Sequence, residues 1–505
     1  MEAPSGKGDH LCVLVHGLWG NPTHLQYVAS ALRACYDQSI LQILIVKRNS
    51  GNFTYDGIET GGERVTREIE DAIEEYARNG IEIRKISIVG YSLGGLVARY
   101  AIGLLFSKGY FERIEPVNFC TFATPHLGVR TPLLGWHNHI WNVLGARTLS
   151  ASGRQLFTID DFRNTGRPLL SILADKDSVF YRGLSMFPNK VLYANVVNDR
   201  STNFYTSGIS RFDPFADLSS VSVNYVSGYS PIVVDPDSPV SPSTKEVEKL
   251  PVTHRVAKTT TGVATGLPMV LIYSLVIPIG VVVFLLNALV QTFSSKRRIR
   301  LHSSDESLDY HGLPLLVEEM QEAAEGIIED IHHEMSPQHL PAGSEESISL
   351  SPVSTIFPVL GHKKAMSSPG HHEGAAKPHT DMNKYPYMTT QPDGAKSSTS
   401  ITAELQAPPT PESMTGDEGQ RDDVSDDTGK GIPKQRQMEF PTLALAPHQF
   451  EMIASLEKLG IRKFPVYIHN DRHSHAAIIV RKPWSKKWEE GKVVVGHWLN
   501  EMFVV

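Results

Sequence analysis

Residues 86–100 read I-S-I-V-G-Y-S-L-G-G-L-V-A-R-Y, and this stretch decides the fold. Ile86–Val89 is an apolar, β-branched run, which is typical of a buried strand, and apolar residues after Gly94 recur at a helical period. A G-x-S-x-G motif between a strand and a helix predicts a nucleophile elbow, a strained turn that raises the Ser92 hydroxyl above the sheet edge. The alternative is a Gly-rich loop in which Ser92 caps the following helix.

The rest of the chain repeats this alternation of strands and helices. Helices are expected between the apolar strand runs, which are Leu11–Val15, Leu41–Val46, Ile86–Val89, Phe119–Ala123 and Val191–Val196. Pro168–Leu184 is expected to be helical, and Phe464–Ile468 to be a strand. Strands that alternate with helices of about ten to fifteen residues predict βαβ units and a parallel sheet. The fold class is therefore α/β, with a mostly parallel sheet.

Composition indicates several regions within the 505 residues. A net charge of −7 gives no indication of a nucleic-acid surface, and three scattered cysteines suit reduced thiols in a cytosolic setting. The polar first residues predict no signal peptide. We expect an N-terminal hydrolase part (8–250), a hydrophobic membrane segment (262–292), an amphipathic helix (313–333), a disordered insert (336–435) and a C-terminal hydrolase part (440–505). An irregular stretch at 127–161 is expected to form a cap beside the pocket mouth.

A serine nucleophile needs a base and an acid that orients the base, and this fold supplies them in the chain order Ser, Asp or Glu, His. Asp199 follows a predicted strand directly, so it is the candidate acid, ahead of Asp175 and Asp177 in helical sequence. Two candidate bases follow the Phe464–Ile468 strand. His475 begins an apolar run that would anchor it and is preferred, with His473 as the alternative.

The oxyanion of an acyl-transfer intermediate needs preorganised N–H donors. The N–H of Leu93, directly after the nucleophile, is one candidate, and the Leu18 N–H in the loop after the first strand is the other. We expect the His16 side chain to support that loop. We expect His126 to line the pocket or to support its own loop. This chemistry needs no cofactor and no metal.

The apolar run Ala264–Leu289 constrains the topology, because Ser92 and Asp199 precede it and His475 follows it. Its roughly 26 residues could span a bilayer, but a single crossing would separate the nucleophile from its base. Pro278-Ile279-Gly280 lies near its middle and indicates a turn. Basic residues flank both ends, which favours the cytosolic side for both. We expect a hairpin in one leaflet or in a lipid-droplet monolayer; the alternatives are a kinked spanning helix and a buried helical hairpin.

Several motifs together are similar to one family: H-G-L-W-G-N, G-Y-S-L-G-G-L-V-A-R-Y, F-A-T-P-H-L-G, N-V-V-N-D and S-H-A-A-I-I-V-R. The chain resembles the fungal putative serine esterase family, α/β-hydrolases that include lipid-droplet phospholipase and monoacylglycerol lipases of yeast. The resemblance covers roughly residues 8–230 and 440–483 and implies a serine hydrolase of glycerolipids with Ser92, Asp199 and His475 at the matching positions. It also implies association with lipid droplets or endomembranes, with the catalytic part facing the cytosol.

The sequence is compatible with three functions. The leading one is a phospholipase or lipase that acts on glycerolipid at a membrane or droplet surface. The closest alternative is a monoacylglycerol lipase or general carboxylesterase. The third is a catalytically silent scaffold that anchors protein partners of the acidic insert to a lipid surface.

Overall fold

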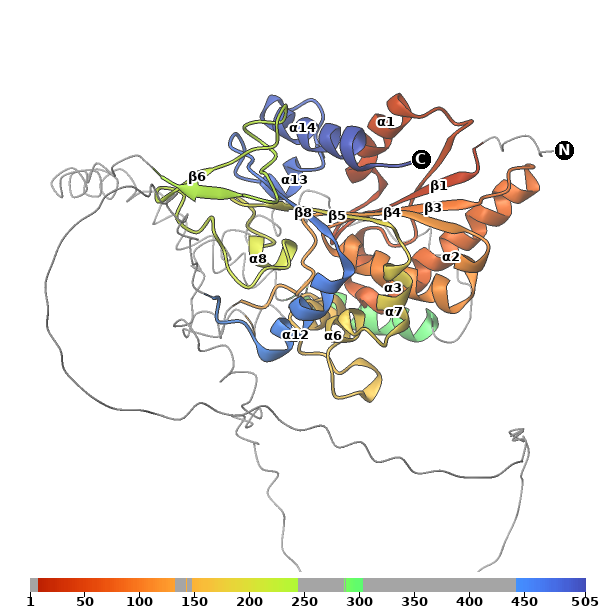
Figure 1. Ribbon diagram of the computed structural model, residues 1–505. Coiled ribbons are helices and arrows are strands. Elements are labelled where there is room, and N and C mark those ends of the chain that lie inside the picture. Colours follow the sequence, from red (N-terminus) through yellow and green to blue (C-terminus); the bar gives the residue numbers. More distant parts are fainter. Residues whose placement is uncertain (1–7, 132–141, 143–147, 244–285, 287, 303–441) are drawn as a thin grey trace, which may run out of the picture. The chain divides into compact units, whose positions relative to one another are not determined.

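The computed structural model describes residues 8–131, 142, 148–243, 286, 288–302 and 442–505 (Figure 1). All of these belong to one compact unit. Three predictions fall largely or wholly outside the described residues: the apolar run up to residue 285, the amphipathic helix 313–333 and the insert 336–435. The expected cap at 127–161 is described at residues 127–131, 142 and 148–161, where the helix α5 (Ser150–Leu156) forms, and its role as a cap stays a prediction. Within the described residues, no helix combines the length and apolarity that crossing a membrane requires.

A six-stranded parallel sheet forms the centre of the unit, in the order β2-β1-β3-β4-β5-β8. The strands are β1 (His10–Val15), β2 (Leu41–Ile45), β3 (Lys85–Tyr91), β4 (Glu115–Phe122), β5 (Asn189–Asn195) and β8 (Arg462–Val466). The first five confirm the predicted alternation, with ends shifted by a few residues. The predicted strand Phe464–Ile468 is β8, which begins and ends two residues earlier.

Both faces of the sheet are buried, which explains why its strands are continuous apolar runs. Successive side chains of a strand point to opposite faces, so Leu11, Val13 and Val15 pack in one core and Cys12 and Leu14 in the other. Helices α2 (Gly57–Arg78), α3 (Leu93–Ser107), α6 (Leu169–Ala174), α7 (Val179–Ser185) and α12 (Pro447–Leu456) cover the first face (Figure 1). Helices α1 (Gln26–Cys35), α13 (Ser474–Ala477) and α14 (Glu489–His497) cover the second.

The stretch Pro168–Leu184 is helical as predicted, but it forms two short helices, α6 and α7, with a break between them. Ser178 accepts a hydrogen bond from the Tyr181 N–H and caps α7, so the chain starts a new helix there. The remaining elements are short. The strands β6 (Val221–Val223) and β7 (Val240–Pro242) form a separate antiparallel pair, and the C-terminal stretch from Trp498 is helical up to Met502.

The sixth strand comes from the far end of the chain. Strand β8 pairs with β5 from Val191 opposite Arg462 to Asn195 opposite Val466. Tyr193 stacks between Phe122 on β4 and Phe464 on β8, with ring centroids 5.1 and 5.4 Å away. The C-terminal part is therefore built into the sheet, beside the strand that precedes Asp199.

Candidate active site

Ser92 lies in the sharp turn that the sequence predicts, between β3 and α3. Its φ of 54° and ψ of −130° are strained for a residue with a side chain. A Cβ at Gly90 would overlap the backbone of Gly95, and a Cβ at Gly94 would overlap the Val15 carbonyl. Both motif glycines are therefore required sterically, and the turn holds the Ser92 hydroxyl at the carboxyl ends of the parallel strands.

The structure brings Ser92, His475 and Asp199 into one hydrogen-bonded line. Ser92 Oγ lies 2.9 Å from His475 Nε2, and His475 Nδ1 lies 2.9 Å from Asp199 Oδ2. The side chains of His475 and Asp199 are 4 % and 2 % exposed, so water is largely excluded from their contact. Since the Asp199 carboxylate accepts a hydrogen bond from Nδ1–H, the lone pair of Nε2 faces the Ser92 hydroxyl.

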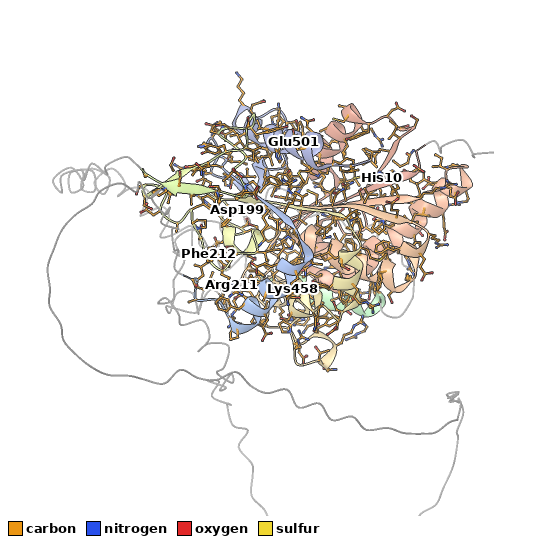
Figure 2. The ribbon with its side chains drawn as sticks, viewed as in Figure 1. His10, Asp199, Arg211, Phe212, Lys458 and Glu501 are labelled. Carbon is orange, nitrogen blue, oxygen red and sulfur yellow. The ribbon has the colours of Figure 1, made fainter. Side chains whose placement is uncertain are left out.

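Asp199 is fixed by the loop that follows β5, and Figure 2 labels its position. Its Oδ1 accepts the backbone N–H groups of Ser201 and Thr202 at 3.1 and 2.7 Å. Its Oδ2 accepts the amide of Asn195, the last residue of β5, at 2.8 Å in addition to His475. The carboxylate is therefore held by four donors, which leaves it little freedom to turn away from the histidine.

The loops after β5 and β8 are also joined directly. Ser474 Oγ donates to the Val197 carbonyl at 2.8 Å, and the Asn198 amide donates to the Ile468 carbonyl at 3.1 Å. Asn198 has a φ of 60°, a left-handed conformation that asparagine tolerates better than most residues. These bonds set His475 opposite Asp199, although the two residues are 276 positions apart in the chain.

The loop after β1 lies against the nucleophile. A Cβ at Gly17 would lie 2.6 Å from Ser92 Cβ and 3.2 Å from Ser92 Oγ, so the loop approaches as closely as a glycine allows. The turn and loop hydrogen bonds among the described residues give no backbone acceptor to the N–H of Leu18 or of Leu93. Both N–H groups lie in segments next to Ser92, which suits oxyanion donors, and this role stays a prediction.

Two nearby histidines are buried and contact the protein rather than the serine. His16 Nδ1 donates to the Gly17 carbonyl at 3.2 Å, and its Nε2 lies 3.4 Å from Ser50 Oγ. Burial lowers the pKa of His16 to about 4, so its imidazole is neutral at physiological pH. His126 Nε2 lies 3.0 Å from Thr121 Oγ1, and burial lowers its pKa well below the usual value. Both side chains support loops beside the site.

The lower-ranked candidates lie elsewhere. His473 is the residue before α13, and its backbone N–H donates to Asp471, whereas His475 reaches Ser92. Asp175 pairs with Arg167 at 2.6 Å on the surface. Among the described residues, no three His, Cys, Asp or Glu side chains gather as a metal site.

Sequence reasoning missed two side chains around this site. The Tyr91 ring lies 5.2 Å from the His475 ring, centroid to centroid, on the residue before the nucleophile. Arg99 is fully buried on α3, and none of its three guanidinium nitrogens has a hydrogen-bond partner among the described residues. Burial lowers the pKa of Arg99 to about 10. Arg99 lies at an ordinary position of a helix, and nothing in the sequence indicates that its charge is buried.

A parallel sheet with a strained serine turn at its centre, and a histidine and an aspartate brought to that serine from later strands, defines an α/β-hydrolase. Residues 5–211 match the family model described as "Putative serine esterase (DUF676)".

Two curated relatives are similar to the same region. "Putative lipase C4A8.10" of Schizosaccharomyces pombe is 31% identical over 211 residues, which are 40% of this chain and 26% of the relative. "Putative lipase ROG1" of Saccharomyces cerevisiae is 31% identical over 244 residues, which are 46% of this chain and 34% of the relative. The match therefore spans only about a third or less of the length of these relatives.

The solved structures that are similar to this chain resemble it only distantly. A phospholipase PlaB from Legionella pneumophila, in complex with thio-NAD, is 15% identical with a TM-score of 0.25, over 39% of this chain and 40% of that chain. RedJ, with a PEG molecule in its active site, is 16% identical with a TM-score of 0.22, over 41% of this chain and 79% of that chain. Scores at this level carry no functional weight.

Proposed function

We propose that the protein is a serine hydrolase that cleaves acyl esters of glycerolipids, as a phospholipase or lipase, at a membrane or lipid-droplet surface. The observation that carries the proposal is the line Ser92–His475–Asp199, with both hydrogen bonds at 2.9 Å. The esterase family of residues 5–211 supports the reaction class. The printed names of the relatives, which call them lipases, support a lipid ester as substrate.

In the proposed reaction, Ser92 Oγ attacks the ester carbonyl while His475 Nε2 takes its proton. The alkoxide that develops on the carbonyl oxygen is stabilised by the N–H groups of Leu18 and Leu93. His475 then gives the proton to the leaving alcohol, and an acyl-enzyme remains on Ser92. Water hydrolyses this ester by the same steps, with His475 acting as base and then as acid. Asp199 keeps the imidazole oriented and stabilises its charged form.

A fluorophosphonate probe, which reacts with an activated serine, tests the proposal. We expect labelling of the full chain that vanishes in Ser92→Ala and falls strongly in His475→Ala, while His473→Ala labels like wild type. No labelling of a folded full chain would sink the hydrolase proposal and would favour a silent scaffold. Rates on phospholipid, monoacylglycerol and short-chain esters then distinguish the phospholipase from the monoacylglycerol lipase and the general carboxylesterase.

The location at a lipid surface needs its own test. If the apolar run Ala264–Leu289 enters and leaves the same side, tags at residues 1 and 505 will show equal protease protection in isolated membranes. Opposite protection would contradict a hairpin. It would also conflict with the structure, in which residues from before and after the run meet in one site.

A further inference from the structure

A helix at residues 288–302, green in Figure 1, begins at the end of the apolar run and packs on the catalytic unit. Its contacts lie on the 3-10 helix η2 (Gly51–Asp56) and on the start of α2. Ser295 Oγ donates to the Tyr55 carbonyl at 3.3 Å. One turn and two turns further on, Arg298 bonds Asp56 and His302 Nε2 lies 3.0 Å from Glu63 Oε2. One face of the helix is therefore fixed to the catalytic unit.

The centre of this contact is a buried ion cluster of Asp56, Arg64 and Arg298, called here the Asp56 cluster. Arg298 donates three hydrogen bonds to the Asp56 carboxylate at 2.8–3.0 Å, and Arg64 donates one at 2.8 Å. The Asp56 side chain is 0 % exposed, and those of Arg64 and Arg298 are 8 % and 9 % exposed. A buried carboxylate is stable only with such full pairing, so the helix is held here by a specific, directional contact.

The opposite face of the helix is unusually apolar for an exposed surface. Four side chains at helical spacing are more than half exposed: Leu286 (58 %), Leu289 (54 %), Val290 (58 %) and Phe293 (67 %). At about 100° per residue, Arg297 and Arg300 continue the same stripe, and Lys296 lies at its margin; all three are exposed. The outward face is thus apolar over its first two turns and cationic over its last two.

This order of side chains fits the surface of an anionic phospholipid layer. Apolar side chains are stabilised in the acyl region, whereas Lys and Arg side chains bind lipid phosphates at the interface. The apolar stripe is the last part of an uncharged sequence that runs from Ala264 to Ser295, and the cations from Lys296 onward follow it directly. A groove on a protein partner would not require the cations to follow the apolar turns.

The fixed face leads from this helix to the proposed oxyanion loop. Tyr55, whose carbonyl accepts Ser295, packs against the Trp19 ring at 6.4 Å, and the Trp19 N–H donates to Thr54 Oγ1 at 3.0 Å. Trp19 is the neighbour of Leu18 and lies two residues after Gly17, where an added Cβ would lie 2.6 Å from Ser92 Cβ. We infer that helix 288–302 is a lipid-docking helix, which the Asp56 cluster fixes to η2, where Thr54 and Tyr55 contact the proposed oxyanion loop, so that docking presents the Ser92 site to the lipid surface.

The first experiment asks whether the outward face enters lipid. In full-length protein with Cys35→Ser, a polarity-sensitive NBD dye on Phe293→Cys should shift to the blue with phosphatidylserine vesicles and be quenched by doxyl-labelled lipid. The same dye on Glu75→Cys, exposed near the far end of α2, should do neither. Overturning results are a water-like dye on vesicle-bound protein, a failure to bind vesicles, or a blue shift without vesicles, which would indicate a second copy on this face.

The cations are tested by a matched pair of double variants. Arg297→Gln with Arg300→Gln should weaken binding to phosphatidylserine vesicles by about thirtyfold, at about fivefold for each charge near the surface. Lys176→Gln with Lys458→Gln removes two exposed charges elsewhere and should leave binding unchanged (Figure 2 labels Lys458). If both double variants lose the same affinity for the vesicles, the effect is one of general charge, and the proposal that this face docks on lipid is wrong.

The connection to the active site rests on the proposed function, so it is tested separately. Arg298→Met leaves Asp56 paired with Arg64, and it should lower the rate on vesicle-borne ester by about tenfold relative to the rate on a soluble short-chain ester. An unchanged ratio in a folded variant would overturn the connection. Vesicle binding is measured on the Ser92→Ala background, so a failure of docking is distinguished from a failure of catalysis, which the fluorophosphonate label reports.

Discussion

The substitution Gly17→Ala tests whether the loop after β1 forms part of the catalytic site. The added Cβ would lie 2.6 Å from Ser92 Cβ, whereas ordinary carbon contacts begin near 3.5 Å, so the loop and the serine must separate by roughly 1 Å. Misplacement of catalytic groups by about 1 Å costs about 100-fold in rate. Gly17 does not have a positive φ, so the backbone itself accepts alanine.

We expect the loss to fall on kcat more than on KM, because the oxyanion donors act on the transition state rather than on bound ester. Hydrolysis of p-nitrophenyl butyrate and the rate of fluorophosphonate labelling measure this. Thermal unfolding should show a modest loss of about 1–3 kcal/mol for the added methyl group.

Gly496→Ala is the matched control for this prediction. Gly496 lies in α14, and no heavy atom lies within 4 Å of the place that an added methyl group would take, so the variant should keep full activity. It should also gain about 0.5–1 kcal/mol of stability, because alanine suits a helix better than glycine. A folded Gly17→Ala protein with wild-type kcat would refute the placement of this loop at the reacting carbonyl.

Three further predictions concern buried charges. Asp199→Asn should lower kcat on a soluble ester by about 10³–10⁴-fold, because the amide cannot hold the same tautomer of His475, while the exposed Asp177→Asn should be silent. Burial raises the pKa of Asp160 to about 6, because burial favours the protonated carboxyl group. The stability that the protonated group gives is lost as the pH rises from about 4 through 6. Asp160→Asn should therefore be more stable than wild type in urea at pH 8 by about 1–3 kcal/mol, with no advantage below pH 4. Burial lowers the pKa of Arg99 to about 10, so its charge costs about 3 kcal/mol at neutral pH. Arg99→Met should therefore raise the urea midpoint, and a lower midpoint would show that the cation has a stabilising partner.

The sheet could be predicted because its strands are buried on both faces and consist of apolar runs. The elbow at Ser92 is encoded within a few residues, and chain order restricts the acid and the base to residues that follow later strands. Asp199 and His475 are the preferred partners on those grounds, and the structure places both on the line to Ser92. Local signals are sufficient here because each partner follows the end of a strand.

Contacts between distant charged residues could not be predicted in the same way. Asp56 and Arg298 are 242 positions apart, and each lies in polar sequence that gives no indication of burial. The choice of His475 over His473 also depends on the turn before α13, since both histidines follow the same strand. By contrast, the break between α6 and α7 has a signal in Ser178, which caps the second helix.

The position of the histidine depends on strand register and not on the length of chain that precedes it. Residues 196–461 leave the sheet after β5 and return as its neighbour β8, so the excursion begins and ends at adjacent strands. For a flexible connection, each doubling of length adds only about 0.6 kcal/mol to the cost of closure. Two kinds of contact then position the histidine, and neither depends on the length of chain between β5 and β8. They are the pairing of Asn195 with Val466 and the hydrogen bonds from Ser474 and Asn198 across the two loops. A chain can therefore carry a long excursion between two adjacent strands and still return a histidine to hydrogen-bonding distance of its serine.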